Sequence, residues 1–394
     1  MIWFWMLACG DKPIENDTAS LDTGIETLNT DDLEPADEPS TEDTNQTDET
    51  DTNQDTSDQS DTNNTEDTNA SNDDQCPDDV VCVDTFPFSH AENTSRSGTD
   101  NFDFYSCSPS TNESGNEIVY RVTLPTDGFL ALNLPESSMG SGVDVDVHLL
   151  GSYDANDCID RGHWTGGSLL TAGTYWVVVD TWVSNNSGPQ SGPYELEIGF
   201  TSFNRLESFG IAAQTAENAL FAFDTAWHNG DTDRFEYAIS DFSLHSSLER
   251  MWIVDLLSGY LLGNLHLAHG EATSSPYDDA WAVDFSNISG SHQSSLGMMK
   301  GAESYYGAYD YSMRMDGLEN GYNDNVRSRA VVVHGWTGSR PEYVQYYGSV
   351  APTWGCPAVD DREIQWVVDT LKDGALLFFW YPDGDWSLHS DYLQ

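Results

Sequence analysis

The sequence predicts a mainly β protein with a few helices, in two folded domains that follow a long disordered linker. Short apolar runs and alternating apolar and polar residues recur between residues 76 and 200, separated by Gly, Pro, Asn and Ser. A second series of such runs extends from about Asp233 onward. The residues before Cys76 carry no such pattern. We therefore divide the chain into an N-terminal segment, a linker, an antiparallel β-sandwich and a C-terminal domain, at residues 1–9, 10–75, 76–200 and 203–394.

The chain is strongly acidic. Its 394 residues include 67 Asp and Glu against 14 Lys and Arg, which gives a formal net charge of −53. Residues 11–79 hold 24 of these carboxylates and a single lysine, Lys12. Such a surface repels phosphates, which excludes a nucleic-acid binder. The excess of carboxylates suits an exported or surface-exposed protein.

The linker at residues 10–75 is dominated by Asp, Thr, Asn and Ser and contains no aromatic residue. A segment of this composition cannot bury enough apolar surface to offset the entropy of ordering it. Like charges also keep it extended. We expect a disordered tether that holds the folded domains away from a membrane.

The N-terminal segment points to export. Met1–Ala8 is apolar but too short to cross a membrane. Met6–Gly10, which reads Met-Leu-Ala-Cys-Gly, resembles a bacterial lipobox, in which the cysteine is lipidated. The resemblance implies lipidation of Cys9 and a protein anchored to a membrane in the periplasm or at the cell surface. The apolar run is short and no basic residue precedes it, so a truncated ordinary signal peptide is the alternative.

The other cysteines fall into two groups. Cys76, Cys82, Cys107 and Cys158 lie in one segment and are able to form two disulfides, with three possible connectivities. No spacing is typical of a structural zinc site. If Cys9 carries lipid, Cys356 is the cysteine left over. It is then either a nucleophile, which we favour, or an inert buried cysteine.

The segment 76–200 has the strand spacing of an antiparallel sandwich. Its motifs resemble the bacterial pre-peptidase C-terminal domain, which implies an accessory domain without an active site. The motifs are Asp103–Cys107, Glu117–Val122, Asp144–Leu150 and Ala172–Asp180, and the expected strands are Ile118–Leu124, Phe129–Leu134, Val143–Leu150, Tyr175–Asp180 and Tyr194–Phe200.

Two aspartates of this segment are candidate cation ligands. Asp144 and Asp146 are two residues apart and therefore lie on one face of a strand. Carboxylate oxygens on one face are able to bind calcium. A solvated strand face is the interpretation that we favour.

The C-terminal domain begins with an expected helix at residues 203–228, followed by Asn229–Thr232 as a break. Further on, three valines lead directly to His334 and Gly335, and Thr353-Trp-Gly-Cys-Pro follows 19 residues after His334. The remaining expected elements are strands at Phe235–Phe242, Arg250–Leu257, Tyr260–Ala268 and Ala375–Tyr381, and a helix at Asp361–Leu371.

Nine short motifs in this order resemble the L,D-transpeptidase (YkuD-like) superfamily, in particular its murein L,D-transpeptidase catalytic domain branch. The resemblance covers residues 232–381 and implies an L,D-transpeptidase-type β fold. The motifs are Ile239–Ser243, Arg250–Leu256, Ala268–Gly270, Phe285–Asn287, Gln293–Gly297, Asp316–Glu319, Asn323–Asn325, Val333–Gly335 and Trp354–Ala358.

The family implies a cysteine acyl-enzyme on peptidoglycan tetrapeptide stems, with 3→3 cross-linking and no metal or cofactor. Cys356 is the implied nucleophile and His334 its base, because an imidazole within reach is able to take the thiol proton. The carbonyl of Gly335 would orient the ring, and the N–H groups of Gly355 and Cys356 would stabilise the oxyanion.

Five further residues are candidates for substrate binding, each with a structural alternative. They are His269, Thr353, Trp354, Ser294 and Ser295. His269 is equally well explained as a core histidine, and the two serines as turn caps. Trp354 stands where the broader family has a histidine, and an arginine expected near the cysteine is missing, which weakens the expected recognition of a substrate carboxylate.

Two other functions remain open. An L,D-carboxypeptidase would use the same nucleophile with water as the acceptor. A cell-wall-binding surface protein would keep the fold without activity.

Overall fold

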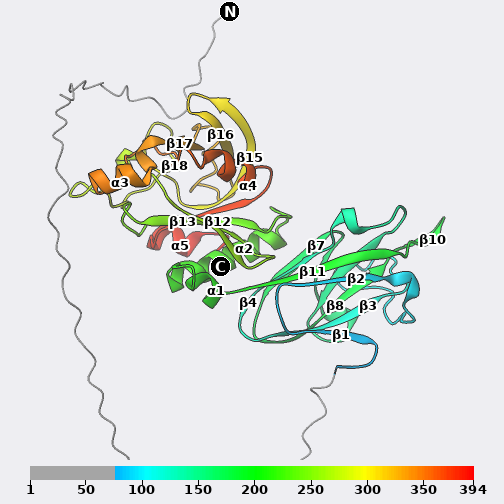
Figure 1. The fold of residues 1–394 in the computed structure, drawn as a ribbon. Helices are drawn as coiled ribbons and strands as arrows, with labels where there is room; N and C mark the ends of the chain where they lie inside the picture. Colours follow the sequence, from blue (N-terminus) through cyan, green and yellow to red (C-terminus); the bar gives the residue numbers. More distant parts are fainter. Residues whose placement is uncertain (1–75) are drawn as a thin grey trace, which may run out of the picture. The chain divides into compact units, whose positions relative to one another are not determined.

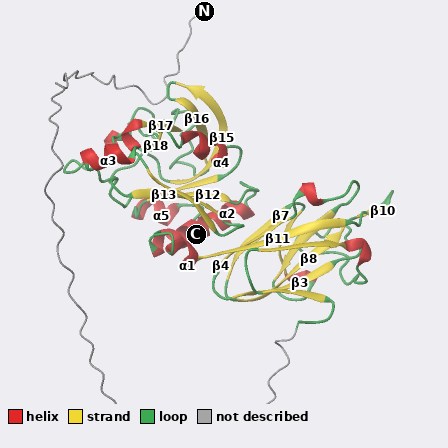
Figure 2. Cartoon of the chain, viewed as in Figure 1, coloured by secondary structure: helices red, strands yellow, loops and turns green. Residues whose placement is uncertain are grey.

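The computed structural model describes residues 76–394, which belong to one compact unit (Figure 1). Strands predominate over helices, as the sequence predicts (Figure 2). The predicted lipidation of Cys9, the alternative signal peptide and the predicted tether lie outside the described residues.

Residues 80–202 form a β-sandwich of two sheets. One sheet has the order β1-β3-β8-β5-β6 and the other β2-β11-β4-β7. The apolar side chains that face each other between the sheets form its core. The strands are β1 (Val80–Val83), β2 (Phe88–Asn93), β3 (Ile118–Leu124), β4 (Gly128–Asn133), β5 (Val145–Leu150), β6 (Cys158–Gly162), β7 (Thr165–Leu170), β8 (Gly173–Thr181) and β11 (Pro193–Ser202), with a small pair β9 (Val183–Ser184) and β10 (Gly188–Pro189).

The sandwich departs from the prediction in one pairing. Strand β1 runs parallel to β3, with Val80 opposite Val119. The other pairs of both sheets are antiparallel. Strand β1 was not predicted, because its four residues, which include Cys82, are too short a run to show a period.

Two disulfides lie in the sandwich, and they select one of the three possible connectivities. Cys76 pairs with Cys82, and Cys107 pairs with Cys158. The second bond attaches the long segment between β2 and β3 to the beginning of β6.

The C-terminal domain contains one eight-stranded sheet with the order β14-β13-β12-β19-β15-β16-β17-β18. The central strand β19 is fully buried and joins two halves of the sheet, running parallel to β12 and antiparallel to β15. The strands are β12 (Glu236–Asp241), β13 (Glu249–Asp255), β14 (Tyr260–His266), β15 (Gly297–Gly307), β16 (Asp310–Gly317), β17 (Val332–Trp336), β18 (Ala358–Asp360) and β19 (Leu376–Trp380).

Five α-helices complete the fold of residues 76–394: α1 (Phe203–Glu207), α2 (Ala213–His228), α3 (Pro341–Tyr347), α4 (Ile364–Leu371) and α5 (Gly384–His389). The predicted single helix at 203–228 is broken, because Gly210 adopts a positive φ of 91° between α1 and α2. Short 3-10 turns lie at Thr94–Arg96, Glu136–Ser138, Ala155–Asp157, Glu271–Thr273 and Thr337–Ser339.

Helix α2 also contacts the sandwich. The rings of Phe223 and Phe129 pack edge to face with centroids 4.9 Å apart. The Leu169 N–H donates to Asp224 at 2.7 Å, and the Trp227 indole N–H donates to Asp160 at 3.0 Å. The apolar core of the C-terminal domain therefore continues onto β4 of the sandwich.

The two edges of the eight-stranded sheet meet just beyond β14. The Ala268 N–H donates to Ala358 O at 2.9 Å, and Gly270 forms an isolated parallel bridge with Thr353. This contact places residues 353–356, which precede β18, beside the chain that leaves β14.

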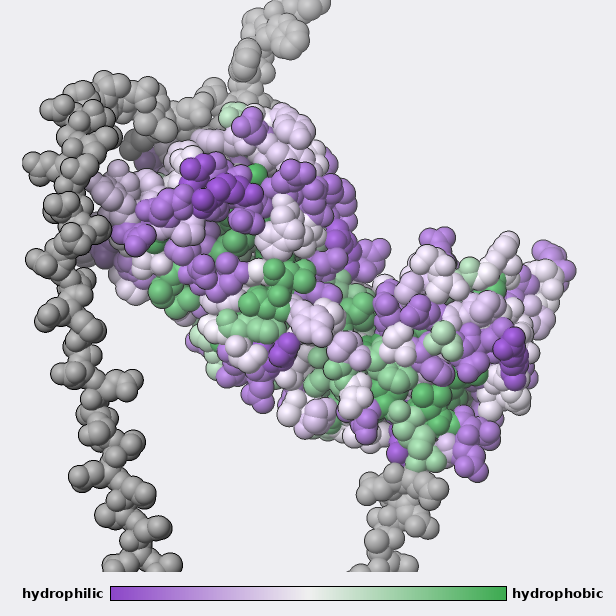
Figure 3. Space-filling view, viewed as in Figure 1, coloured by the Kyte–Doolittle hydropathy of each residue, from purple (hydrophilic) through white to green (hydrophobic). Residues whose placement is uncertain are grey.

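Hydrophilic side chains cover much of the face drawn in Figure 3, interrupted by apolar patches. This distribution agrees with the high carboxylate content of the chain. None of the helices at residues 76–394 is long and apolar enough to cross a membrane.

Candidate functional site

His334 lies in β17 after three buried valines, as the sequence predicts. Its Nδ1 is 2.9 Å from the carbonyl oxygen of Gly335, the contact that the resemblance implies. The ring stacks on Tyr309, with centroids 4.0 Å apart and planes 20° apart. Two constraints, one polar and one aromatic, therefore fix the orientation of the imidazole.

The second nitrogen of this ring is poised to accept a proton. Because Nδ1 donates to the Gly335 carbonyl, the neutral tautomer leaves a lone pair on Nε2. Nε2 is buried and has no hydrogen-bond partner. Burial lowers the pKa of His334 to about 4, so the ring is neutral near pH 7.

Cys356 lies against the strand that carries His334. Strands β17 and β18 are parallel, with His334 opposite Ala358, and Cys356 lies two residues before β18 begins. The Val332 N–H points at Sγ from 3.4 Å, and Ala330 O is 3.9 Å from Sγ. The fold therefore brings the predicted nucleophile and base to the same edge of the sheet.

The sulfur of Cys356 is oxidised in this structure. It takes part in a disulfide and is not a free thiol. The expectation that Cys356 is left unpaired is wrong for this state. A thiol at this position requires reduction first.

Thr353 and Gly355 shape the loop that presents Cys356. The Thr353 hydroxyl donates to Cys356 O at 2.7 Å and accepts from the Gly355 N–H at 3.2 Å. Gly355 has a φ of 106°, and a Cβ there would lie 2.6 Å from Gln293 O. Only glycine suits this position without a shift of the neighbouring backbone.

The predicted substrate residues His269, Ser294 and Ser295 are buried and already engaged. Arg250 donates to Nδ1 of His269 at 2.6 Å, and Nε2 lies 3.1 Å from Asp279 O. This arrangement favours the alternative of a core histidine. Burial and the neighbouring guanidinium lower the pKa of His269 to about 3.

The two serines hold backbone segments together. The Ser294 hydroxyl accepts from the Gly270 N–H at 3.0 Å, and that of Ser295 donates to Ser286 O at 2.9 Å. These contacts favour the turn interpretation of both residues. Trp354 is half-buried and stacks on His292, with centroids 4.4 Å apart, so an aromatic face lies beside the cysteine loop.

Arg329 is a residue of this site that the sequence reasoning did not single out. Its Nη2 is 3.6 Å from the position that a Cβ on Gly355 would take. It lies two residues before the three valines, and the sequence signal was this basic residue beside the strand that delivers His334.

A family model matches most of this domain. Residues 208–380 match the L,D-transpeptidase catalytic domain family. The match covers the sheet from β12 to β19 and includes His334 and Cys356. It confirms the resemblance seen in the sequence and supports a peptidoglycan L,D-transpeptidase-type function for this domain.

No curated protein matches the chain. Among solved structures, the pre-peptidase C-terminal domain of collagenase from Bacillus anthracis is 13% identical, covering 32% of this chain and 99% of its own, with a TM-score of 0.21. A periplasmic lysozyme inhibitor of g-type lysozyme from Aeromonas hydrophila is also 13% identical, covering 31% and 97%, with a TM-score of 0.20. These TM-scores carry no inference about function.

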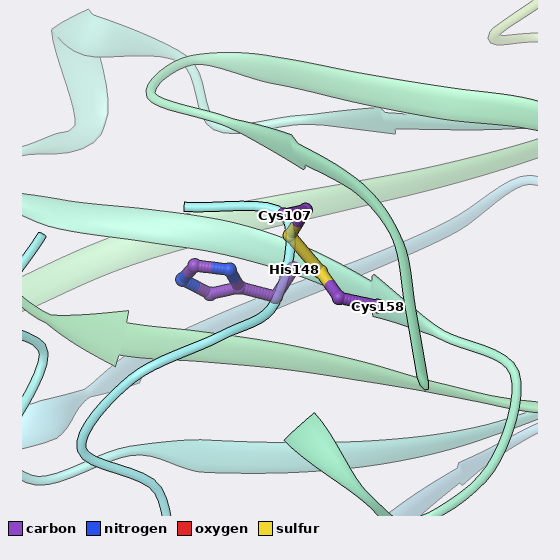
Figure 4. A group of neighbouring side chains, drawn as sticks. All are labelled: Cys107, His148 and Cys158. Carbon is purple, nitrogen blue, oxygen red and sulfur yellow. A yellow bond between two sulfur atoms is a disulfide. The ribbon is translucent and has the colours of Figure 1, made fainter. Parts of the chain in front are cut away.

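Outside residues 208–380, the sandwich holds two groups with metal-ligand residue types. In the first, Cys107 and Cys158 are bonded to each other and the ring of His148 points away from the bond (Figure 4). These sulfurs are not available to a metal.

The second group is Asp144, Asp146 and His163. Asp146 is 1% exposed and pairs with Arg161 at 2.5 Å and with His163 at 2.9 Å. A solvated strand face is therefore wrong for Asp146. The Arg161 guanidinium already supplies the positive charge that a cation would bring.

Proposed function

We propose that the L,D-transpeptidase domain forms a thioester between Cys356 and peptidoglycan tetrapeptide stems and transfers the acyl group to a neighbouring stem as a 3→3 cross-link. The observation that carries this proposal is the oriented, neutral His334, whose Nε2 has no partner, on the strand that contacts Cys356 Sγ. The family match of residues 208–380 supports the substrate class.

The reduced thiol gives its proton to Nε2 of His334 as sulfur attacks the carbonyl carbon of the third stem residue. The bond to the terminal D-alanine then breaks, and the proton passes from His334 to the leaving amine. An amine of a second stem attacks the thioester, forms the new amide and restores the thiol.

The tetrahedral oxygen needs donors beside Cys356. The Gly355 N–H is already engaged by the Thr353 hydroxyl. A role for Gly355 in the oxyanion hole therefore requires that this contact loosen as the substrate binds, and the N–H of Cys356 is the donor that we favour.

We further propose an exported protein. The net charge of −53 and the lipobox-like Met6–Gly10 support a location in the periplasm or at the cell surface, with a lipid on Cys9.

The test is acylation of the full chain after reduction. A carbapenem is incubated with the reduced protein and with its Cys356→Ala variant, and the intact mass is measured. A gain of one drug mass that depends on Cys356 is expected. No adduct on a reduced, folded protein would contradict the mechanism and favour a wall-binding surface protein.

Analysis of the products formed from tetrapeptide stems shows which group, an amine or water, attacks the thioester. Release of D-alanine together with 3→3 dimers indicates a transpeptidase. Release without dimers indicates the L,D-carboxypeptidase, in which water resolves the same thioester.

A further inference from the structure

Arg329 and the residue after it both approach the loop that carries Cys356. Nη2 of Arg329 approaches the backbone at Gly355, the residue before the nucleophile. The next residue, Ala330, has its carbonyl oxygen 3.9 Å from Cys356 Sγ. The guanidinium therefore lies beside the residue that precedes the nucleophile, and the backbone that follows Arg329 approaches the sulfur itself.

The partners of this guanidinium are neutral oxygens. Nη1 donates to Ser286 O and Ser295 Oγ, both at 2.6 Å. Nη2 donates to Gln293 O at 2.7 Å and to Ser291 Oγ at 3.2 Å. No carboxylate at residues 76–394 is recorded as its ion-pair partner, although the chain has 67 acidic residues.

Arg327, two residues earlier, shows the contrast. It pairs with Glu303 at 2.9 Å and with Asp316 as well. Carboxylates at the surface neutralise the charge of Arg327. The guanidinium of Arg329 is half-buried and contacts carbonyl and hydroxyl oxygens, which carry no net charge. An uncompensated cation in such a position has a strong effect on nearby charges.

The chemistry of the site requires such a charge. Burial keeps His334 neutral near pH 7, so the imidazole offers no positive charge to the sulfur before proton transfer. A thiolate at Cys356 must be stabilised by another group. Arg329 is a cation that the described contacts place beside the Gly355–Cys356 backbone.

We propose that Arg329 is the positioning residue that stabilises the thiolate formed when reduced Cys356 gives its proton to His334, and that it does so through its charge. This proposal rests on the proposed function. Arg329 would also supply, from the strand that carries His334, an arginine near the cysteine, where the sequence lacks the expected one.

The test measures the thiol directly and not the transfer reaction. The full chain is reduced, and the rate of alkylation of Cys356 by iodoacetamide is followed from pH 5 to 10 by mass analysis of the Cys356 peptide. The thiolate sulfur forms a bond to carbon and iodide leaves, so the rate reports the thiolate fraction. In Arg329→Gln, the midpoint of the profile is expected to move up by roughly one pH unit.

Three matched variants separate charge from anchoring. Arg329→Lys keeps the charge and is expected to retain most of the parent profile. Arg327→Gln removes a charge that is already paired, and is expected to leave the midpoint in place. Ser291→Ala removes one hydrogen bond to Arg329 while the charge remains, and is also expected to leave it in place.

An unchanged midpoint in Arg329→Gln would overturn the proposal. Equal shifts in Arg329→Gln and Ser291→Ala would overturn it as well, because anchoring of residues 286–295 would then account for the effect. Near-ultraviolet circular dichroism identifies a variant that has not folded. If Arg329→Gln does not fold, the alkylation profile of Arg329→Lys is compared with that of the parent protein instead. A parent protein that alkylates normally but takes no carbapenem would contradict the proposed function and leave this inference standing.

Discussion

At the scale of single residues, several side chains of the site form hydrogen bonds to the main chain and so fix its conformation. The sequence suggested Thr353 as a substrate contact, but the structure directs its hydroxyl at the main chain of Gly355 and Cys356. The resemblance implied the Gly335 carbonyl as the group that orients His334, and the two atoms lie 2.9 Å apart. Both contacts are local, which is why motif spacing pointed to these residues.

Thr353→Val tests the hydroxyl at this scale. The replacement keeps the branched shape and removes both hydrogen bonds, which leaves a buried carbonyl and a buried N–H without their partner. We expect a loss of about 1–3 kcal/mol in the free energy of unfolding. Because the loop loses its geometry, we also expect carbapenem acylation of the reduced protein to slow by roughly ten-fold or more.

Thr353→Ser, which keeps the hydroxyl, is the matched control and should acylate at close to the parent rate. Urea unfolding and the time course of the mass adduct supply the two readouts. A Val variant as fast as the Ser variant would show that the loop does not depend on this hydroxyl.

At the scale of elements, each strand that the sequence predicted has a counterpart in the structure, with shifts of a few residues at its ends, but β2, β6 and β7 of the sandwich were not predicted. Periodicity also missed the hairpin of β15 and β16, which was expected as a loop-rich region. Gly301 and Gly307 interrupt the apolar pattern of β15, and its register with β16 shifts between Gly301 and Ser304. Such a strand shows no regular period of two in its sequence.

The two disulfides of the sandwich close loops of very different length, so their contributions to stability are expected to differ. Cys107 and Cys158 are 51 residues apart, whereas Cys76 and Cys82 are six apart. In the chain-entropy description, the longer loop stabilises by about 4 kcal/mol and the shorter by about 2 kcal/mol. Replacing the longer pair by serine should therefore lower the melting temperature of the sandwich more.

Differential scanning calorimetry of Cys107→Ser/Cys158→Ser beside Cys76→Ser/Cys82→Ser makes this comparison. A larger loss in the short-loop variant would show that local packing around residues 76–82 matters more than loop length.

At the scale of the whole molecule, buried titratable groups set the pH dependence of stability. Burial lowers the pKa of His148 and of His269 to about 3, and that of His334 to about 4. In the unfolded chain these rings titrate near 6.5, so the unfolded state binds more protons below that pH. The stability that these rings contribute is present above pH 6.5 and is lost as the pH falls toward 4.

Two carboxyls act in the opposite direction. Burial raises the pKa of Glu113 and of Asp180 to about 9, so the folded state holds protons that the unfolded state releases. The stability that they contribute is present below about pH 4 and is lost as the pH rises toward 9. We therefore expect maximal stability near pH 6.5 and a decline between pH 6.5 and 9.

Urea unfolding at intervals from pH 4 to 9 checks this profile. Glu113→Gln should flatten the alkaline decline, because the amide stays neutral in both states, by up to about 1.4 kcal/mol per pH unit. The exposed Glu136→Gln is the control and should leave the profile unchanged. A free energy of unfolding that rises from pH 6.5 to 9 would contradict the raised pKa values of Glu113 and Asp180.

The sequence by itself determined the mainly β class and the resemblance of the C-terminal domain to the L,D-transpeptidase family, and it predicted His334 and Cys356 as the candidate site. Periodicity and motif order are local properties, and both can be read along the chain. Only the tertiary structure decided the disulfide pairing, the parallel β1–β3 contact, the structural roles of His269 and the two serines, and the place of Arg329. These features depend on residues that are distant in sequence and meet only when the sheets form, so no local pattern records them.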